Sequence, residues 1–257
     1  MIKDVSQHFL DEMMNDEGLM KNSGICRFFM QISGEVVLRA FLGSLENKQF
    51  MRYTNGKLLS QELAEIVIDS GRYLLSPDTI VKGYILKEGW WLKPRYSFLL
   101  TKDQRVHKER LDTFKSYIMN MIEERFELFG TQSNAATQAE CFVDLIVKES
   151  VKNGEFSKVE ILQQFMSFFF AGMDTTGITT AMTMYCLAKY TDKYEKVVDE
   201  IKRIMGPNKT ELDFEDISKF SYLHAFIKEV LRIHSTVSLL IPRQVTRITQ
   251  DLLFCCC

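Results

Sequence analysis

The sequence contains little proline, tryptophan, histidine and cysteine. Only four prolines occur in 257 residues, with two tryptophans and four histidines. Proline-rich linkers and extended proline helices are therefore excluded. The six cysteines are Cys26, Cys141, Cys186 and the terminal run 255–257. Their spacing matches neither a zinc site nor a disulfide framework, so no metal ligand is assigned.

An excess of one charge sign is also missing. The 32 basic and 34 acidic side chains leave a formal net charge of -2, which gives no electrostatic reason to expect nucleic acid as a partner. Residues 1–8 contain charged side chains and no apolar run. A signal peptide or membrane anchor is therefore not expected there. With 46% hydrophobic residues, the composition is typical of a globular protein.

Between the prolines, apolar residues recur three or four positions apart, which predicts a mainly helical fold. Helices are expected over residues 27–42, 59–75, 101–129 and 140–150. Gly43 is expected to end the first of these, because glycine readily adopts the conformations that terminate helices. In the third helix, Arg110 and Arg125 are interpreted as members of surface ion pairs with nearby glutamates.

A turn and an aromatic segment separate two of these helices. Ser76-Pro77-Asp78 is typical of a turn. The segment that follows contains five large rings, Tyr84, Trp90, Trp91, Tyr96 and Phe98. Such rings can line an apolar ligand cavity, or they can fill a core beneath a loop. The second interpretation is favoured, because aromatic side chains dominate protein cores.

A capping box predicts that a long helix begins near Ser157, where Ser157 and Glu160 can satisfy each other's exposed amides. The apolar stretch from Phe165 to Ala188 has about 24 residues, enough to span a bilayer. Asp174 would lie near the centre of that span and cost roughly 2.5 to 3.5 kcal/mol on insertion scales. A central helix buried on nearly all sides in a globular protein is therefore expected instead.

Within this helix, Ala171-Gly172-Met173-Asp174-Thr175-Thr176 breaks the usual helical preferences. Glycine costs about 1 kcal/mol in a helix, and a buried carboxyl must be paired or protonated. Gly172 allows close approach of a backbone or ligand, and threonine hydroxyls can bond to the carbonyl one turn back. Proton delivery to a bound small molecule would suit Asp174 and Thr175. A notch for helix packing is an equal alternative.

A second motif lies in an amphipathic helix near residues 221–234. Glu229 and Arg232 are three positions apart, so their side chains can form a charge-assisted hydrogen bond. An exposed pair of this kind contributes only about 0.3 to 0.5 kcal/mol. Alone, this spacing is more typical of ordinary surface chemistry than of a functional site.

Taken together and in this order, the motifs resemble the cytochrome P450 family of heme-thiolate monooxygenases. Residues 171–176 are similar to the family's oxygen-binding helix segment. Glu229 and Arg232 are similar to the family's buried Glu-x-x-Arg pair. Residues 216–223 and 239–243 resemble the segments on either side of that pair. The resemblance implies a mainly α, partial cytochrome P450 fold with a long central helix and little β structure near residue 257.

The resemblance also implies roles for the matched residues. Asp174 would pass protons and Thr175 would orient dioxygen and its water, while Glu229 and Arg232 would lock the core. The residues expected near the heme cofactor are Ala171, Gly172 and Arg243. Gly172 would make room over the iron, and Arg243 would bind a propionate. The implied reaction inserts one oxygen atom of dioxygen into an apolar substrate, with electrons from an NADPH-cytochrome reductase-type partner.

The family's cysteine ligand lies in a Phe-x-x-Gly-x-Arg-x-Cys-x-Gly loop, whose glycine-rich context is missing around residues 255–257. We therefore expect one incomplete domain, with roof-like helices over residues 1–139 and the central helix and following strand over 140–257. The endoplasmic reticulum membrane is implied only for a complete family member. The alternatives are an inactive truncated relative, or a helical binding or membrane-associated protein with accidental motifs.

Overall fold

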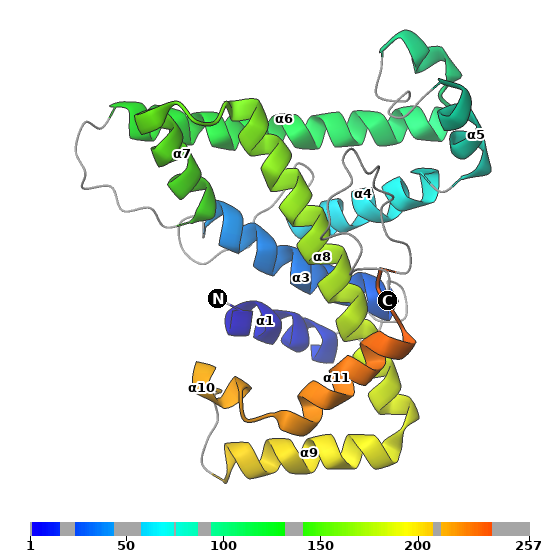
Figure 1. The fold of residues 1–257 in the computed structure, drawn as a ribbon, viewed down its shortest axis with the longest axis vertical. Helices are drawn as coiled ribbons and strands as arrows, with labels where there is room; N and C mark the ends of the chain where they lie inside the picture. Colours follow the sequence, from blue (N-terminus) through cyan, green and yellow to red (C-terminus); the bar gives the residue numbers. More distant parts are fainter. Residues whose placement is uncertain are drawn as a thin grey trace, which may run out of the picture. The chain divides into compact units, whose positions relative to one another are not determined.

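The computed structural model describes residues 2–15, 24–43, 58–74, 76–86, 94–131, 141–207 and 212–237. Every regular element in these ranges is a helix, which confirms the mainly α prediction (Figure 1). The elements are α1 (Ile2–Asn15), α3 (Ile25–Leu42), α4 (Leu59–Leu74), α5 (Pro77–Leu86), the 3₁₀ helix η3 (Pro94–Leu99), α6 (Lys102–Thr131), α7 (Phe142–Asn153), α8 (Lys158–Lys189), α9 (Thr191–Met205), α10 (Phe214–Ile217) and α11 (Ser221–Ile233).

The chain divides into two compact units, residues 1–194 and 195–257. The first unit holds α1 to α8 and the start of α9, and the second holds the rest of α9 with α10 and α11. The strand expected around residues 239–243 lies outside the described residues.

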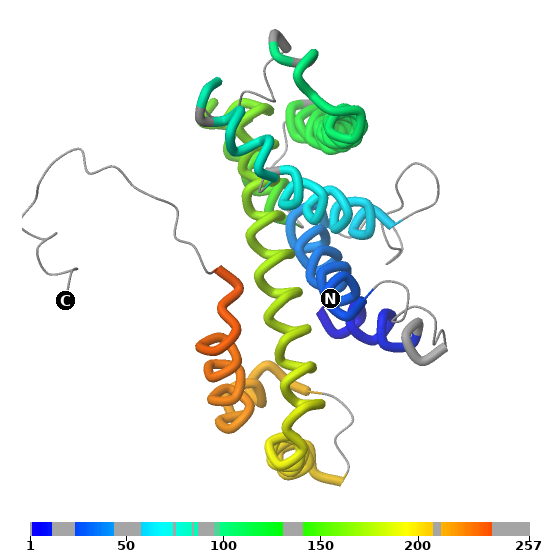
Figure 2. The backbone as a smooth tube through the Cα atoms, turned by 90° about the vertical axis from the view of Figure 1, so that its right-hand side faces the viewer, coloured from blue at the N-terminus to red at the C-terminus, as the bar shows by residue number. Residues whose placement is uncertain are grey.

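The main core of the first unit lies where α8 packs along α3, with α4, α6 and α7 around this pair (Figures 1 and 2). Its largest fully buried side chains include Leu38, Leu63, Phe114, Phe165 and Phe169. Burying each such side chain contributes about 1.5–3 kcal/mol. A smaller cluster of Val5, Phe9, Phe28 and Leu58 joins α1 to α3.

Local signals place several helix ends where the sequence predicts them. Gly43 follows α3 with a φ of 81°, and its N–H bonds to the carbonyl of Arg39. The helices α4, α6 and α7 begin within two residues of the expected positions. Glycine accepts the positive φ of Gly43 without a side-chain clash, which is why the chain leaves α3 there.

The prediction of a turn at Ser76-Pro77-Asp78 holds only for Ser76, which lies in a bend after α4, and is wrong for Pro77 and Asp78, which begin α5. The Ser76 hydroxyl accepts a hydrogen bond from the Thr79 N–H at 3.3 Å, as the cap of a helix does. Pro77 occupies the first helical position, where its missing N–H is not needed. Turns and helix starts use the same residue types, so the sequence alone does not separate them.

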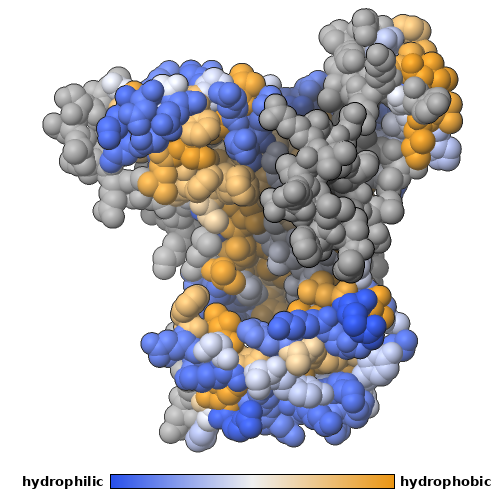
Figure 3. Space-filling model, viewed as in Figure 1, coloured by the Kyte–Doolittle hydropathy of each residue, from blue (hydrophilic) through white to orange (hydrophobic). Residues whose placement is uncertain are grey.

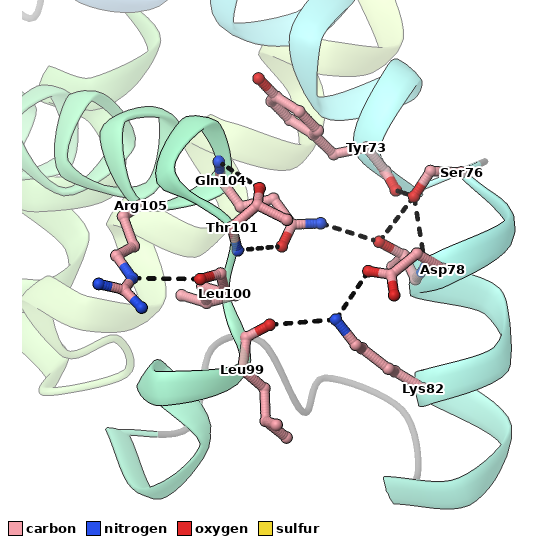
Figure 4. Close-up of polar contacts among 10 residues, drawn as sticks. Tyr73, Ser76, Asp78, Lys82, Leu99, Leu100, Thr101, Gln104 and Arg105 are labelled. Atoms are coloured by element: carbon pink, nitrogen blue, oxygen red, sulfur yellow. Dashed lines mark hydrogen bonds and ion pairs between the residues drawn. The ribbon is translucent and has the colours of Figure 1, made fainter.

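Polar side chains tie α5 to the segment that leads into α6 (Figure 4). Lys82 donates to the Asp78 carboxylate at 2.8 Å and to the Leu99 carbonyl at 3.1 Å. The Gln104 amide donates to the Thr79 hydroxyl at 3.3 Å. These contacts attach α5 through hydrogen bonds, whereas its apolar side chains Ile80, Val81 and Ile85 are exposed.

Of the five rings in the aromatic segment, Phe98 has 70% of its surface exposed. The core-filling interpretation is therefore wrong for this side chain. Trp90, Trp91 and the side chain of Tyr84 lie outside the described residues, so the interpretation of those rings remains a prediction.

Two arginines of α6 that were expected in surface ion pairs connect helices instead. Arg110 bonds to three carboxylates of α4, those of Glu62 at 2.9 Å, Glu65 at 3.0 Å and Asp69 at 3.2 Å. Its partners are far away in the sequence, whereas the expected pairs were between neighbours. The spacing of charges along one helix does not reveal the charges of the helix opposite.

Arg125 connects three helices. Its Nε donates to the Asp144 carboxylate of α7 at 2.9 Å, and one of its terminal nitrogens donates to the Leu42 carbonyl near the end of α3. The exposed fractions of the Arg125 and Asp144 side chains are 15% and 13%. This largely buried pair therefore fixes how α3, α6 and α7 meet.

The long helix α8 has one buried face and one open face within the described residues. Its buried face includes Ile161, Phe165, Phe169, Met173 and Gly177. Phe168, by contrast, has 50% of its surface exposed. The expectation of burial on nearly all sides is therefore wrong for this part of the chain. None of the described helices combines the length and apolarity required of a membrane span.

Candidate functional site on helix α8

The helix that carries the first motif begins at the predicted position. The Glu160 carboxylate accepts a hydrogen bond from the Ser157 N–H at 2.8 Å, and the Ser157 hydroxyl accepts one from the Glu160 N–H at 3.3 Å. These reciprocal bonds satisfy two amides that a helix start leaves without partners. They confirm the predicted capping box and fix the start of α8.

The rotation of α8 is set by a close crossing with α3. A Cβ atom added to Gly177 would lie 2.6 Å from the Cα of Met30, closer than atoms can pack. The Ser33 hydroxyl of α3 donates to the Met173 carbonyl of α8 at 2.8 Å. Met173 immediately precedes Asp174, so α3 holds the backbone beside the candidate acid.

Gly172 belongs to the same crossing. A Cβ atom at Gly172 would lie 2.9 Å from the Cγ2 of Val37 in α3. Helix packing therefore accounts for this glycine, as the second interpretation of the motif proposed. The expected role of Gly172 beside a cofactor remains a prediction.

Ala171 and Thr175 lie one turn apart, and Ala171 is exposed. The Thr175 hydroxyl donates to the Ala171 carbonyl at 2.7 Å. Further threonine hydroxyls of α8 bond one turn back in the same way, from Thr179 to Thr175, from Thr180 to Thr176 and from Thr183 to Thr179. The predicted back-bonding of these hydroxyls is thus confirmed.

Asp174 lies half-buried beside Thr175. Burial raises the pKa of its carboxyl above the ordinary value, because water stabilises the charged form less well there. Within the described residues, no hydrogen bond or ion pair reaches this carboxyl. A carboxyl in this state holds its proton more firmly than an exposed one, which suits a proton donor.

An apolar surface adjoins this part of α8 (Figure 3). The Phe168 and Phe142 rings both pack against Phe41, with centroids 5.4 and 4.7 Å away, yet Phe142 has 39% and Phe168 50% of its surface exposed. Phe168 lies three residues before Ala171 and therefore near it on the helix. The open face of α8 thus combines an apolar ring, a small side chain and a hydroxyl.

The second motif forms the expected ion pair in the second unit. The Arg232 guanidinium donates to both oxygens of Glu229, at 2.8 and 2.7 Å. This bonding lowers the pKa of Glu229 and raises that of Arg232. However, the exposed fractions of the two side chains are 54% and 70%, so the pair is not buried within the described residues as the family resemblance implied.

Sequence reasoning missed a buried carboxylate that supports α11. Glu200 of α9 is only 4% exposed and accepts hydrogen bonds from the backbone N–H groups of Tyr222 at 2.8 Å and Leu223 at 2.9 Å. The Ser221 hydroxyl adds a bond at 3.2 Å. Glu200 thereby caps the helix that carries Glu229 and Arg232. A helix cap supplied by another helix leaves no local pattern in the sequence.

We expect Glu200→Gln to lower the melting temperature of the chain by several degrees at neutral pH, because the charged acceptor of two backbone amides is lost. Burial opposes ionisation of Glu200, but the bonds from Tyr222, Leu223 and Ser221 outweigh it and lower the pKa. The advantage of the wild type is therefore present above the ordinary glutamate pKa of about 4.3. It is lost as the pH falls through the lower pKa of the folded state.

Thermal unfolding followed by circular dichroism between about pH 7 and pH 3 measures this difference. Glu195→Gln is the matched control, because Glu195 is exposed on the same helix. Equal effects of the two substitutions would contradict the role of Glu200.

Arg243, the remaining expected contact of the cofactor, lies outside the described residues. So do the cysteines 255–257, to which no metal-binding role was assigned. Cys141 and Cys186 are buried, and Cys26 is exposed. Within the described ranges, no group of three or more His, Cys, Asp or Glu side chains is arranged to hold a metal ion.

Comparison with known proteins agrees with the motifs. Cytochrome P450 71A8 of Mentha piperita is 26% identical over 227 residues, covering 86% of this chain and 41% of the relative. Trans-cinnamate 4-monooxygenase of Glycyrrhiza echinata is 30% identical over 59% of this chain and 29% of the relative. Carnosic acid synthase of Rosmarinus officinalis is 34% identical over 54% of this chain and 28% of the relative. The chain thus spans less than half the length of these relatives.

The fold gives the same result. The cytochrome P450DA heme domain superposes with a TM-score of 0.62 at 15% identity, covering 90% of this chain and 44% of that domain. The family profile described as Cytochrome P450 matches residues 27–253. Because this match covers most of the sequence and includes both motifs, the chain belongs to the cytochrome P450 family.

Proposed function

We propose that this chain supplies the proton-delivering side of a heme monooxygenase site, which inserts one oxygen atom of dioxygen into an apolar organic substrate. The observation that carries the proposal is the position of Asp174 and Thr175. A half-buried carboxyl with a raised pKa lies beside a hydroxyl near the open face of α8. The name of one relative, trans-cinnamate 4-monooxygenase, states a reaction of this class.

The residues of this face fit one side of a flat, largely apolar cofactor. Ala171 and Thr175 present small side chains there, and Phe168 offers an exposed ring. Heme, when bound, supplies the activation of dioxygen. Arg243 is proposed to bind a propionate. None of the described cysteines, Cys26, Cys141 and Cys186, is proposed to hold the iron.

Thr175 and Asp174 are proposed to have different roles in proton transfer. The Thr175 hydroxyl donates its own hydrogen to the Ala171 carbonyl, so its lone pairs remain able to accept a hydrogen bond from water. Asp174 carries the proton, which would pass to the water held by Thr175. The α3 crossing supports this arrangement because it fixes the backbone at Met173.

The remaining parts of the proposal rest on family membership. Electrons would come from an NADPH-cytochrome reductase-type donor, and a complete protein would lie at the endoplasmic reticulum membrane. Glu229 and Arg232 would stabilise the domain, which we propose to be single. Because both side chains are exposed within the described residues, this role would require packing partners from outside those residues. The competing candidate is a relative without enzymatic activity.

Hemin titration of the purified chain, followed by the Soret absorbance, tests the cofactor face. Ala171→Phe places a ring on this face and is expected to weaken hemin binding about tenfold, equivalent to about 1.4 kcal/mol. Ala188→Phe is the matched control, because Ala188 is also an exposed alanine of α8. Equal weakening by both substitutions, or no saturable binding, would contradict the proposed face.

Turnover tests the proposed chemistry. With hemin, a reductase and NADPH supplied, Asp174→Asn is expected to lower formation of oxygenated product about a hundredfold, the lower range of general acid catalysis. Asp192→Asn, at an exposed aspartate, is expected to leave turnover unchanged. Absence of product from the unchanged chain would instead support the inactive relative.

A further inference from the structure

His107 of α6 lies in the joint between α4 and α6. Its side chain is only 4% exposed. Nε2 lies 3.0 Å from the Ser70 hydroxyl of α4, and the imidazole packs against the Tyr73 ring with 5.1 Å between centroids. One ring thus makes both a polar and an apolar contact across the joint.

The other side of the imidazole has no such support. The Nδ1 atom is buried, and no hydrogen-bond partner for it exists among the described residues. The neutral ring has one N–H donor and one acceptor nitrogen, whereas the charged ring has two N–H donors. Protonation of His107 would therefore leave a buried donor without an acceptor, which is unfavourable.

The surrounding charges do not offset this cost. Asp69 of α4 favours a charged imidazole and Arg110 of α6 disfavours it, while burial is the largest influence and lowers the pKa of His107. The Asp69 carboxylate already accepts a bond from Arg110. The other carboxylates of α4 at this joint, Glu62 and Glu65, also bond to Arg110.

We propose that His107 is a proton-sensitive latch: the neutral imidazole strengthens the contact between α4 and α6, and protonation weakens it. The unfolded or released histidine has an ordinary pKa of about 6.5. Because the closed joint binds this proton less readily, its stability falls as the pH falls below that value. The latch would therefore be closed at neutral pH and loosened in mild acid. This inference does not depend on heme or on the proposed reaction.

Hydrogen exchange of the full chain, corrected for intrinsic exchange rates, measures the latch. Protection of the α4 amides is expected to fall severalfold between about pH 7.5 and about pH 5.5, because the released histidine takes up a proton that the closed joint resists. His107→Gln keeps a donor for Ser70 and cannot titrate in this range, so its α4 protection should not change. His224→Gln, at an exposed histidine of the second unit, should behave as the wild type.

An equal fall in His107→Gln, or no fall in the wild type, would overturn the proposal. If His107→Gln already loses α4 protection near pH 7.5, the substitution itself has opened the joint. Titration of the His107 ring by NMR in the wild type then decides the question. A midpoint at or above about 6.5 would show that the closed joint does not resist the proton.

Discussion

Replacing Arg125 with methionine is expected to lower the free energy of unfolding by about 3–5 kcal/mol, the usual cost of removing one partner of a buried ion pair. Methionine has a similar length but offers no donor. The Asp144 carboxylate, 13% exposed, would lose its ion-pair partner, and the Leu42 carbonyl would lose its bond from the guanidinium. Three helices would then meet without their common polar contact.

Chemical denaturation of the chain, followed by circular dichroism, measures this loss. Lys102→Met is the control on the same helix, because Lys102 is exposed, and a change within about 0.5 kcal/mol is expected. The double variant Arg125→Met with Asp144→Asn should cost less than Arg125→Met alone, because no charge is left without its ion pair, while asparagine keeps an oxygen to accept the Cys141 N–H at the start of α7. A double variant that is less stable than Arg125→Met would show that the bond to Asp144 is not the source of the effect.

Gly177→Ala is expected to destabilise the chain by about 1–3 kcal/mol, the range found when atoms are added to a packed interior. The upper end is expected because the added Cβ would lie 2.6 Å from the Cα of Met30 and 2.8 Å from its nitrogen. Backbone atoms cannot rotate away as side-chain ends can. The two helices would have to separate along their crossing.

Gly71→Ala in α4 is the matched control, since no atom lies within 4 Å of a Cβ placed there. Alanine is a better helix former than glycine by about 0.8–1.0 kcal/mol. The two glycine substitutions should therefore change stability with opposite signs in the same denaturation assay. Stabilisation by both substitutions would show that helical preference, and not the crossing, determines the result.

The parts of the fold that the sequence predicted depend on neighbours in the chain. Ser157 and Glu160 form the predicted capping box, and Gly43 ends α3, because the groups involved are within four residues of each other. The sequence also predicted where most of the long helices lie, since apolar periodicity is a property of a single segment.

The parts that could not be predicted depend on contacts between distant residues. Nothing near Arg125 in the sequence indicates that Asp144 and Leu42 will be its partners. Gly172 was recognised as unusual, but whether its open side faces a cofactor or another helix depends on where Val37 lies.

The candidate site was predicted in its residues but not in its surroundings. Thr175 bonds to the carbonyl one turn back, as the motif indicated, and the pairing of Glu229 with Arg232 was also expected. The exposure of that pair and the support from Glu200 were not, because burial and helix capping across a chain are set by tertiary packing.

The hydroxyl contacts of α8 have a consequence for its backbone. In a regular helix, each carbonyl accepts one bond, from the amide four residues later. The carbonyls of Ala171, Met173 and Thr175 each accept a second bond from a hydroxyl. A carbonyl oxygen has two lone pairs, so these hydroxyl bonds form in addition to the amide bonds. The bonds from Thr175 and Thr179 favour a bend of the helix here, whereas the bond from Ser33 ties the same stretch to α3, so the direction of the backbone beside Asp174 is set by both helices.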